Sequence, residues 1–173
     1  MNCSTAKTTS HASTQPRELS CSWWLWWRLR RALIERGRGR SRESGAFLLG
    51  TRDHHHARIR DFVLYDDLDP HALDTGIVQF DGRYFARLWE QCRRLGLTVV
   101  ADVHVHPGGS EQSFLDAQHP MVSQAGHVSL ILPKFAVGPQ PRKGIGMYRY
   151  LGRKRWSTVP IAERKRFLHL SVF

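Results

Sequence analysis

The stretch LTVVADVHVHPGGSEQSFLDAQHP, residues 97–120, combines a strand, a sharp turn and the start of a helix. Apolar and polar residues alternate from Ala101 to His106, which is typical of a β-strand with one buried face. Residues two apart in a strand share a face, so His104 and His106 point the same way, with Cα atoms roughly 6.6 Å apart at about 3.3 Å of rise per residue. Pro107 and two glycines then end the strand. The pattern predicts two imidazoles that converge on one ion.

The opposite face of this strand is predicted to be buried and to fix its register, through Val99, Ala101, Val103 and Val105. Asp102 then shares the face of the two histidines. There it either orients a histidine or contacts substrate. The alternative is a charged residue that lines the mouth of a cleft.

Ser113 and Asp116 admit two interpretations. Ser-x-x-Asp resembles a capping box, in which both side chains bind amides at the start of a helix. Beside His-x-His, however, Asp116 is also the expected third ligand of a Zn²⁺ site whose fourth position is open to water. Such a set leaves Zn²⁺ with a net positive charge, which lowers the pKa of its water toward roughly 7. An iron site with two histidines and one carboxylate has the same ligand types and stays open.

A hydrolytic metal site also needs a base that accepts and returns a proton. Glu43 is the best candidate, because it stands at the entrance of an apolar run, GAFLLGT, that reads as a core strand. The alternative is a surface glutamate paired with Arg42 or Arg40.

The remaining histidines and Cys92 favour structural roles. His119 and His127 either face the site or make ordinary core and loop hydrogen bonds. His54–His56 fall in a predicted hairpin turn, where they would bind metal only adventitiously. Cys92 lies on the apolar stripe of a predicted helix over 81–96, which favours a core side chain over a nucleophile.

The element order predicts an α/β domain with a mixed β-sheet flanked by helices. Strands are expected at 45–51, 57–65, 97–106, 126–133 and 145–152, with a loop at 66–76 and a short basic segment at the C-terminus. We expect a disordered polar arm at 1–20, a basic amphipathic N-terminal helix at 21–42 and a catalytic domain at 43–173. In the helix, Trp23, Trp26, Trp27, Arg30 and Ile34 follow helical spacing. It is expected to dock on the domain, and a membrane-surface or partner helix is the alternative.

Composition limits the classes of protein to which the chain can belong. The chain has 173 residues, with 26 Lys and Arg against 15 Asp and Glu, so it carries a formal charge of +11 and attracts acidic partners. Its three cysteines form no CxxC pair, which favours neither a disulfide framework nor a thiolate zinc site and is consistent with the cytoplasm. WWLWW at 23–27 is too short for a membrane span.

These residues together resemble a known family, the JAMM or MPN-type (JAB domain) zinc metalloproteases. Its signature is an upstream glutamate, then His-x-His-Pro, then Ser-x-x-Asp, which matches Glu43, residues 104–107 and residues 113–116. Surrounding segments, including ESGAFLLG and HPMVSQAGHVSLILPKFA, resemble the bacterial branch associated with ubiquitin-like conjugation systems. The resemblance covers about residues 28–157. Five residues separate Pro107 from Ser113, slightly fewer than is usual in the family.

The resemblance implies a cytidine-deaminase-like fold and an isopeptidase or peptidase that removes or processes a ubiquitin-like modifier. It implies that His104, His106 and Asp116 bind Zn²⁺, that Glu43 is the general acid/base and that Ser113 stabilises the tetrahedral intermediate. The implied partners are the C-terminal tail of a ubiquitin-like protein, its conjugates, and E1-like and E2-like proteins.

Three other classes of protein share parts of this sequence pattern. The Asp-x-His-x-His of an amidohydrolase barrel is excluded by length, because only 67 residues (173 − 106) follow His106. A noncatalytic MPN-type scaffold would be expected to lack ligands. Binding of nucleic acid through the basic segments at 28–42, 142–155 and 164–166 is disfavoured, because the aromatics are not interleaved with those charges for base stacking.

Overall fold

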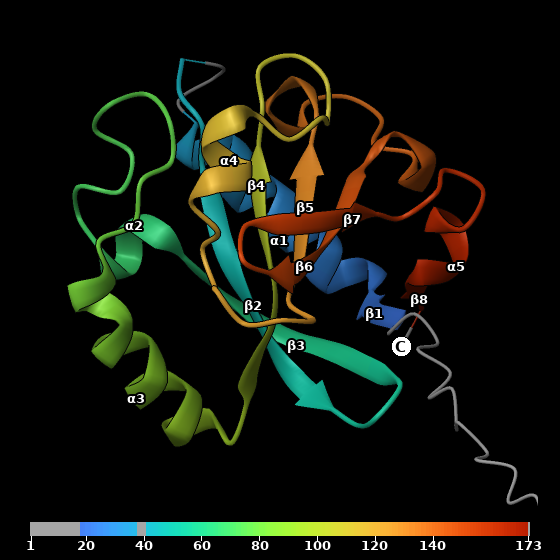
Figure 1. Ribbon diagram of the computed structural model, residues 1–173, viewed down its shortest axis with the longest axis horizontal. Helices are drawn as coiled ribbons and strands as arrows, with labels where there is room; N and C mark the ends of the chain where they lie inside the picture. The colour runs from blue at the N-terminus through green and yellow to red at the C-terminus, as the bar shows by residue number, and fades with distance from the viewer. Residues whose placement is uncertain (1–17, 38–40, 173) are drawn as a thin grey trace, which may run out of the picture.

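The computed structural model describes residues 18–37 and 41–172, which form a mixed sheet in the order β7-β6-β5-β4-β2-β3-β1-β8 (Figure 1). The strands are β1 Glu18–Ser22, β2 Gly45–Arg52, β3 His56–Leu64, β4 Thr98–Val105, β5 Val128–Leu132, β6 Gly146–Gly152, β7 Arg155–Thr158 and β8 Leu168–Ser171. The pairs β1–β3, β1–β8 and β4–β5 are parallel and the others are antiparallel. The predicted mixed α/β architecture is confirmed.

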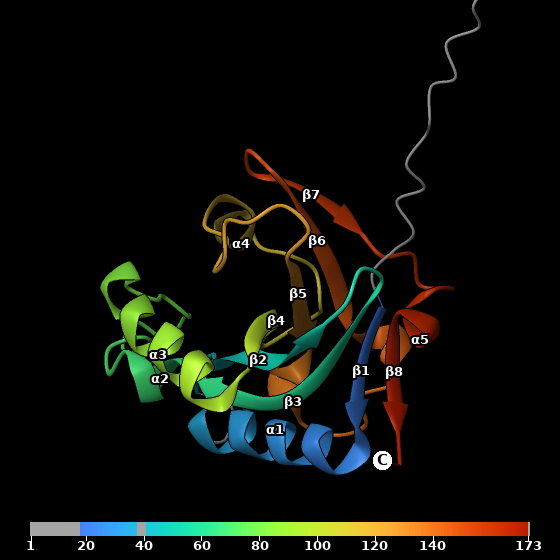
Figure 2. The same ribbon diagram turned by 90° about the horizontal axis from the view of Figure 1, so that it is seen from below.

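Helices flank this curled sheet (Figure 2). They are α1 Trp23–Arg36, α2 Tyr65–Leu68, α3 Phe85–Leu95, α4 Phe114–Gln118 and α5 Arg164–Phe167, with short 3₁₀ turns η1 Gly82–Tyr84, η2 Lys134–Ala136 and η3 Arg142–Gly144. In Figure 2, α1 runs along the underside of the sheet, whereas α4 lies beyond its other side. Among the described helices, none is long and apolar enough to cross a bilayer.

Two apolar clusters pack on the two faces of the sheet. One joins α1 to Val103 and Val105 of β4 and to their neighbours. The other joins α2 and α3 to Phe47 and Leu49 of β2. Because side chains alternate along β4, His104, which lies between the two valines, faces away from α1. The histidine side of β4 is therefore the side opposite α1.

Helix α1 forms because its first turn is capped and one of its sides is apolar. The Ser22 hydroxyl accepts the N–H of Leu25 at 3.2 Å, which satisfies an amide that has no partner within the helix. The buried side comprises Leu25, Trp26, Leu29 and Leu33. It differs from the predicted stripe, since Trp23 and Trp27 are exposed and only Trp26 of that set is fully buried. Three leucines and one tryptophan thus pack against the sheet, and the other two indoles of the predicted stripe do not.

The hairpin β2–β3 and the helix over 81–96 are confirmed. Asp81 caps η1 through the N–H of Arg83, and Gly96 ends α3 with a left-handed φ of 63°, which glycine adopts without strain. Cys92 of α3 is buried in the apolar cluster that joins α2 and α3 to β2, as predicted. Trp89, one turn before Cys92 on α3, remains 44% exposed.

Several sequence-based expectations were wrong, and each error involves contacts distant in sequence. Residues 18–20, assigned to the polar arm, belong to β1, while residues 1–17 of that arm lie outside the described residues. The expected loop at 66–76 begins with part of α2. The basic C-terminal segment supplies β7 and β8, and β8 is stabilised by parallel pairing with β1. Val99 packs on the α3 side because a bulge shifts the register between β2 and β4.

Candidate metal centre

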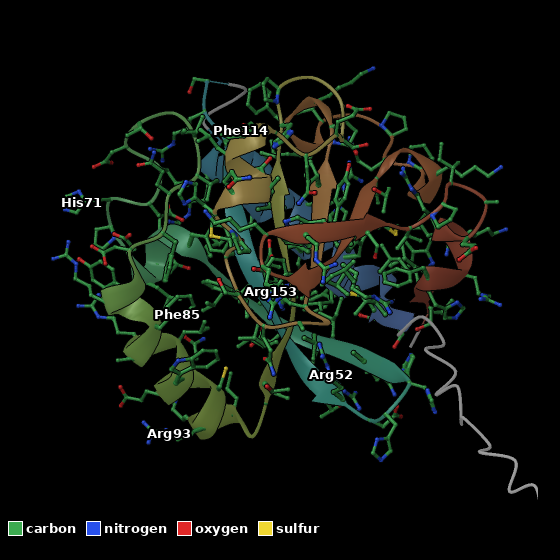
Figure 3. The ribbon with its side chains drawn as sticks, viewed as in Figure 1. Arg52, His71, Phe85, Arg93, Phe114 and Arg153 are labelled. Carbon is green, nitrogen blue, oxygen red and sulfur yellow. The ribbon has the colours of Figure 1, made fainter. Side chains whose placement is uncertain are left out.

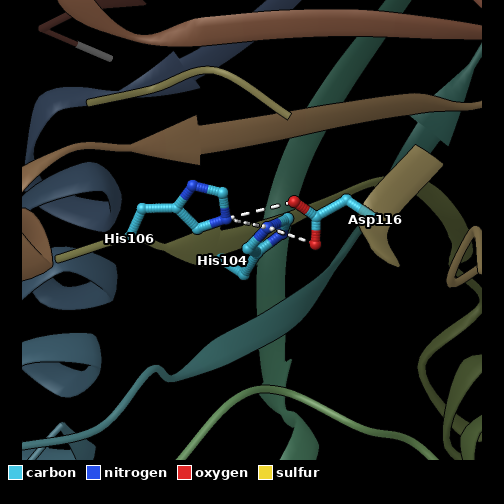
Figure 4. Close-up of side chains that lie close together, drawn as sticks. All are labelled: His104, His106 and Asp116. Atoms are coloured by element: carbon cyan, nitrogen blue, oxygen red, sulfur yellow. Dashed lines mark hydrogen bonds and ion pairs between the residues drawn. The ribbon is translucent and has the colours of Figure 1, made fainter. Parts of the chain in front are cut away.

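Three candidate ligand side chains meet where β4 ends and α4 begins (Figure 4). The Nε2 atoms of His104 and His106 lie 3.1 Å apart. Asp116 Oδ1 lies 3.4 Å from Nε2 of His104, and its Oδ2 lies 3.2 Å from Nε2 of His106. The predicted convergence of two imidazoles and one carboxylate is therefore present in the fold.

The spacing of these atoms fits a tetrahedral cation. Bonds of about 2.0–2.1 Å to zinc at tetrahedral angles separate neighbouring ligand atoms by about 3.3–3.4 Å. The two ring nitrogens are 3.1 Å apart, and each lies 3.2–3.4 Å from a different oxygen of the Asp116 carboxylate, so each pair of atoms is close to that value. Two imidazole nitrogens that face each other need a proton or a cation between them, since two lone pairs repel. The donor set accordingly suits a metal ion.

Local charge also favours a cation here. Burial alone would lower the pKa of His104, but Asp116, and to a smaller extent Asp102 and Glu43, raise it overall. Burial would raise the pKa of Asp116, yet its hydrogen bonds with His104 and His106 lower that pKa strongly. The carboxylate is thus ionised, and the surrounding acids stabilise positive charge at the imidazoles.

Hydrogen bonds at the start of α4 orient Asp116. Its Oδ2 accepts the N–H of Ser113 at 2.7 Å, and the Ser113 hydroxyl accepts the N–H of Asp116 at 3.1 Å. This is a complete capping box. The helix is further attached to β7, because Trp156 Nε1–H donates to the Ala117 carbonyl at 3.0 Å. The capping-box interpretation of Ser-x-x-Asp is confirmed, and the cap aims the same carboxylate at the two histidines.

Glu43 lies directly before β2, at the end of the sheet where β4 terminates. Antiparallel pairing sets Gly45 opposite His104, which brings the chain just before β2 beside the chain just after β4. The Glu43 carboxylate accepts the N–H of Val78 at 3.3 Å through Oε2. Its charge contributes to the raised pKa of His104. No described ion pair joins Glu43 to Arg42, whose guanidinium binds the Arg36 carbonyl.

Asp102 lies two residues before His104 on β4 and is a buried acceptor, with 1% of its surface exposed. His127 Nε2 donates to it at 2.7 Å, the Ser129 hydroxyl at 3.0 Å and the Tyr65 hydroxyl at 3.2 Å. The alternative of a charge at the mouth of a cleft is therefore wrong. Asp102 does orient a histidine, but the histidine is His127. No sequence pattern pointed to Tyr65, which comes from a different part of the chain.

A hollow of about 530 Å³ adjoins Asp116 on its outer side. His119, which follows α4 and is exposed, contributes to its wall rather than to the ligand group. The wall also includes residues 77–80, which lie outside the sheet, and the first residue of α3. It is lined by Ile77, Val78, Gln79, Phe80, Phe85, Leu115, Asp116, Gln118, His119, Pro120, Met121 and Ser123.

The histidines of the β2–β3 turn form no comparable group. Within residues 18–37 and 41–172, the single cluster of metal-ligating side chains is the one at His104, His106 and Asp116. In the turn, the backbone N–H groups of His55 and His56 donate to Asp53 Oδ1 at 2.9 and 2.7 Å. The turn is thus held by an Asx-type contact, which needs no metal.

Comparison with known proteins links the chain to a metalloprotease. It is 26% identical to "Probable metalloprotease y4jG" of Sinorhizobium fredii over 129 residues, which cover 75% of this chain and 80% of the relative. Among solved structures, it is similar in fold to protein DSY2949 from Desulfitobacterium hafniense, with a TM-score of 0.62 and 13% identity over 88% of this chain and 92% of that protein. No family model matches. The chain therefore resembles a probable metalloprotease in sequence and carries a His-His-Asp group fit for a metal ion.

Proposed function

We propose that this protein is a JAMM-type zinc metallopeptidase that cleaves an isopeptide or peptide bond at the C-terminal tail of a ubiquitin-like protein. The observation that carries the proposal is the convergence of His104, His106 and Asp116 at separations that suit tetrahedral zinc. The similarity to a probable metalloprotease supports the peptidase class. The signature around Glu43 and the mixed α/β fold support the JAMM assignment and its cytidine-deaminase-like topology.

His104, His106 and Asp116 would hold the ion. When bound by two neutral imidazoles and one carboxylate, Zn²⁺ supplies a water that ionises near neutral pH and a Lewis acid for a carbonyl oxygen. The hydrogen bonds of the capping box keep Asp116 aimed at the histidines, so little reorganisation is needed. Iron is the competing metal for this ligand set, and the metal content of purified protein decides between them.

Glu43 is proposed to move the proton. Its Oε2 accepts the Val78 N–H, which orients the carboxylate and leaves Oε1 to take a proton from the nucleophilic water. The same oxygen then returns the proton to the leaving nitrogen. Because a hydroxyl can accept and donate at once, Ser113 keeps its own hydrogen for the oxyanion while its oxygen accepts the Asp116 N–H.

The hollow beside Asp116 is proposed to hold the substrate chain. Its wall at 77–80 lies outside the sheet, and we propose that the peptide tail runs along it beside Asp116. E1-like and E2-like proteins are the proposed sources of the conjugates.

The test is cleavage of a ubiquitin-like protein joined through its C-terminal tail to a lysine side chain. Glu43→Gln is expected to retain zinc while kcat falls at least about 100-fold, since it removes the proton acceptor. His104→Ala is expected to lose both zinc and cleavage. Glu35→Gln, on the exposed side of α1, is the matched control and keeps full activity.

Two outcomes contradict the proposal. Wild-type kcat in zinc-loaded Glu43→Gln would remove the proposed proton carrier. Tight binding of the tail by zinc-loaded wild type without cleavage would favour the noncatalytic scaffold instead. Mass spectrometry of the metal and rescue of a chelated sample by zinc accompany both measurements.

A further inference from the structure

Helix α1 presents three tryptophans to solvent on the side that does not pack against the sheet. Trp23, Trp24 and Trp27 are 52%, 63% and 52% exposed. Arg28 and Arg31 lie on the same exposed side. These five residues are called the tryptophan face. Figure 2 shows α1 along the underside of the sheet, so this face forms an outer surface of the molecule.

The polar groups of the tryptophan face are almost entirely donors. The Arg28 guanidinium lies 4.6 Å from the centre of the Trp24 ring, and that of Arg31 lies 5.6 Å from the Trp27 ring. Indole N–H and guanidinium groups donate hydrogen bonds and accept none. Glu35 is the sole acid in the α1 sequence, and it pairs with Arg31 at 2.9 Å. The face thus combines a large apolar area with cations and few acceptors.

We propose that the tryptophan face binds the surface of an anionic phospholipid bilayer. Such a surface offers phosphate acceptors and negative charge above an apolar layer, which matches arginines interspersed with indoles. The chain's formal charge of +11 adds long-range attraction to the same surface. Binding is peripheral, because the inner side of α1 stays packed on the sheet through Leu25, Leu29 and Leu33.

Charge and ring geometry disfavour two other occupants. A second copy docked face to face would bring Arg28 and Arg31 against their own symmetry mates, with little acid to pair them. Single-stranded nucleic acid binds by stacking bases on open aromatic faces. Here, one face each of Trp24 and Trp27 is covered by a guanidinium group.

Binding of the tryptophan face to a bilayer leaves the candidate metal centre uncovered. The Val103 and Val105 side chains point toward α1, whereas His104 between them points to the opposite side of the sheet. A molecule bound to lipid through the tryptophan face therefore directs its metal centre away from the bilayer. Binding and cleavage of a soluble protein substrate are compatible in this arrangement.

The experiment is flotation of the full chain with vesicles of phosphatidylcholine and phosphatidylglycerol at 3:1, compared with pure phosphatidylcholine. Wild type is expected to float with the anionic vesicles, with a blue shift of its tryptophan emission. Arg28→Glu with Arg31→Glu is expected to weaken binding more than about 25-fold, since each basic residue at such a surface contributes roughly fivefold. Trp24→Ala with Trp27→Ala is expected to abolish the blue shift.

Matched controls distinguish the contribution of the tryptophan face to vesicle binding from the contribution of the net charge of the chain. Arg93→Glu with Arg94→Glu makes the same change in net charge on α3, where Arg93 points outward at the far end of that helix (Figure 3), and is expected to lower binding by less than fivefold. Trp89→Ala, which removes a 44% exposed indole, is expected to bind as wild type does. Unchanged thermal unfolding shows that each variant is folded.

Three results would overturn the proposal. Equal losses in the α1 and α3 charge variants would mean that only bulk charge matters. Dimerisation in sedimentation velocity that disappears in Trp24→Ala with Trp27→Ala would assign the face to a second copy. A short DNA strand that competes with vesicles for the wild type, and that no longer binds Trp24→Ala with Trp27→Ala, would assign the tryptophan face to nucleic acid.

Discussion

Zinc is expected to stabilise the folded protein through His104, His106 and Asp116. The two ring nitrogens are 3.1 Å apart and each lies 3.2–3.4 Å from one oxygen of the Asp116 carboxylate, close to the separation of about 3.3–3.4 Å that a tetrahedral ion needs, so the group is largely preformed in the folded chain. The unfolded chain has no such preformed set. Zinc at about 100 times its dissociation constant should therefore add about 2.7 kcal/mol to the free energy of unfolding.

For a domain of this size, each kcal/mol raises Tm by about 2–4 °C, so the expected shift is about 5–11 °C. The assay is calorimetric or fluorescence-monitored thermal unfolding of chelator-treated protein, with and without zinc. His104→Ala should remove most of the shift. The variant in which all of His54–His56 are alanine is the control, because it deletes the other histidine-rich segment and should retain the full shift.

An unchanged zinc shift in His104→Ala, with loss of the shift in the His54–His56 variant, would refute the reasoning. It would place the tight site in the β2–β3 turn and leave the group on β4 and α4 as a hydrogen-bonded cluster. A shift that vanishes in neither variant would equally contradict the assignment.

Three further outcomes are expected. Gly45→Ala should lower the free energy of unfolding in urea by about 1–3 kcal/mol, because the new Cβ would overlap the Tyr65 ring; an unchanged urea midpoint would contradict this. His127→Ala should cost about 1–3 kcal/mol in the same assay, because buried Asp102 loses its shortest hydrogen bond, and retention of stability would show that the bond contributes nothing. Burial raises the pKa of Cys21 to about 12, so its thiol is almost wholly protonated at pH 8 and should stay unmodified by maleimide in the folded protein; rapid labelling in a mass-spectrometric assay would oppose this.

Local pattern was sufficient for much of the fold. Period-two alternation identified β3 and β4, a short apolar run identified β2, and the i, i+3, i+4 spacing identified α3, because each pattern is complete within a few residues. Strands β1 and β8 were missed, since each is short and is stabilised by parallel pairing with a segment about 150 residues away. The bulge opposite Leu48 and Leu49 was also missed, because it depends on the register between two strands.

By itself, the sequence determined that His104 and His106 share one side of a strand and that Ser113 caps a helix carrying Asp116, because each relation spans a few residues of regular backbone. Tertiary structure alone decided that this carboxylate reaches both imidazoles, that Glu43 arrives beside them through β2, and that Asp102 binds Tyr65, His127 and Ser129. It also decided which indoles of α1 face water. The physical reason is that such contacts are fixed by how strands pair and helices pack, which no repeat within a short window encodes.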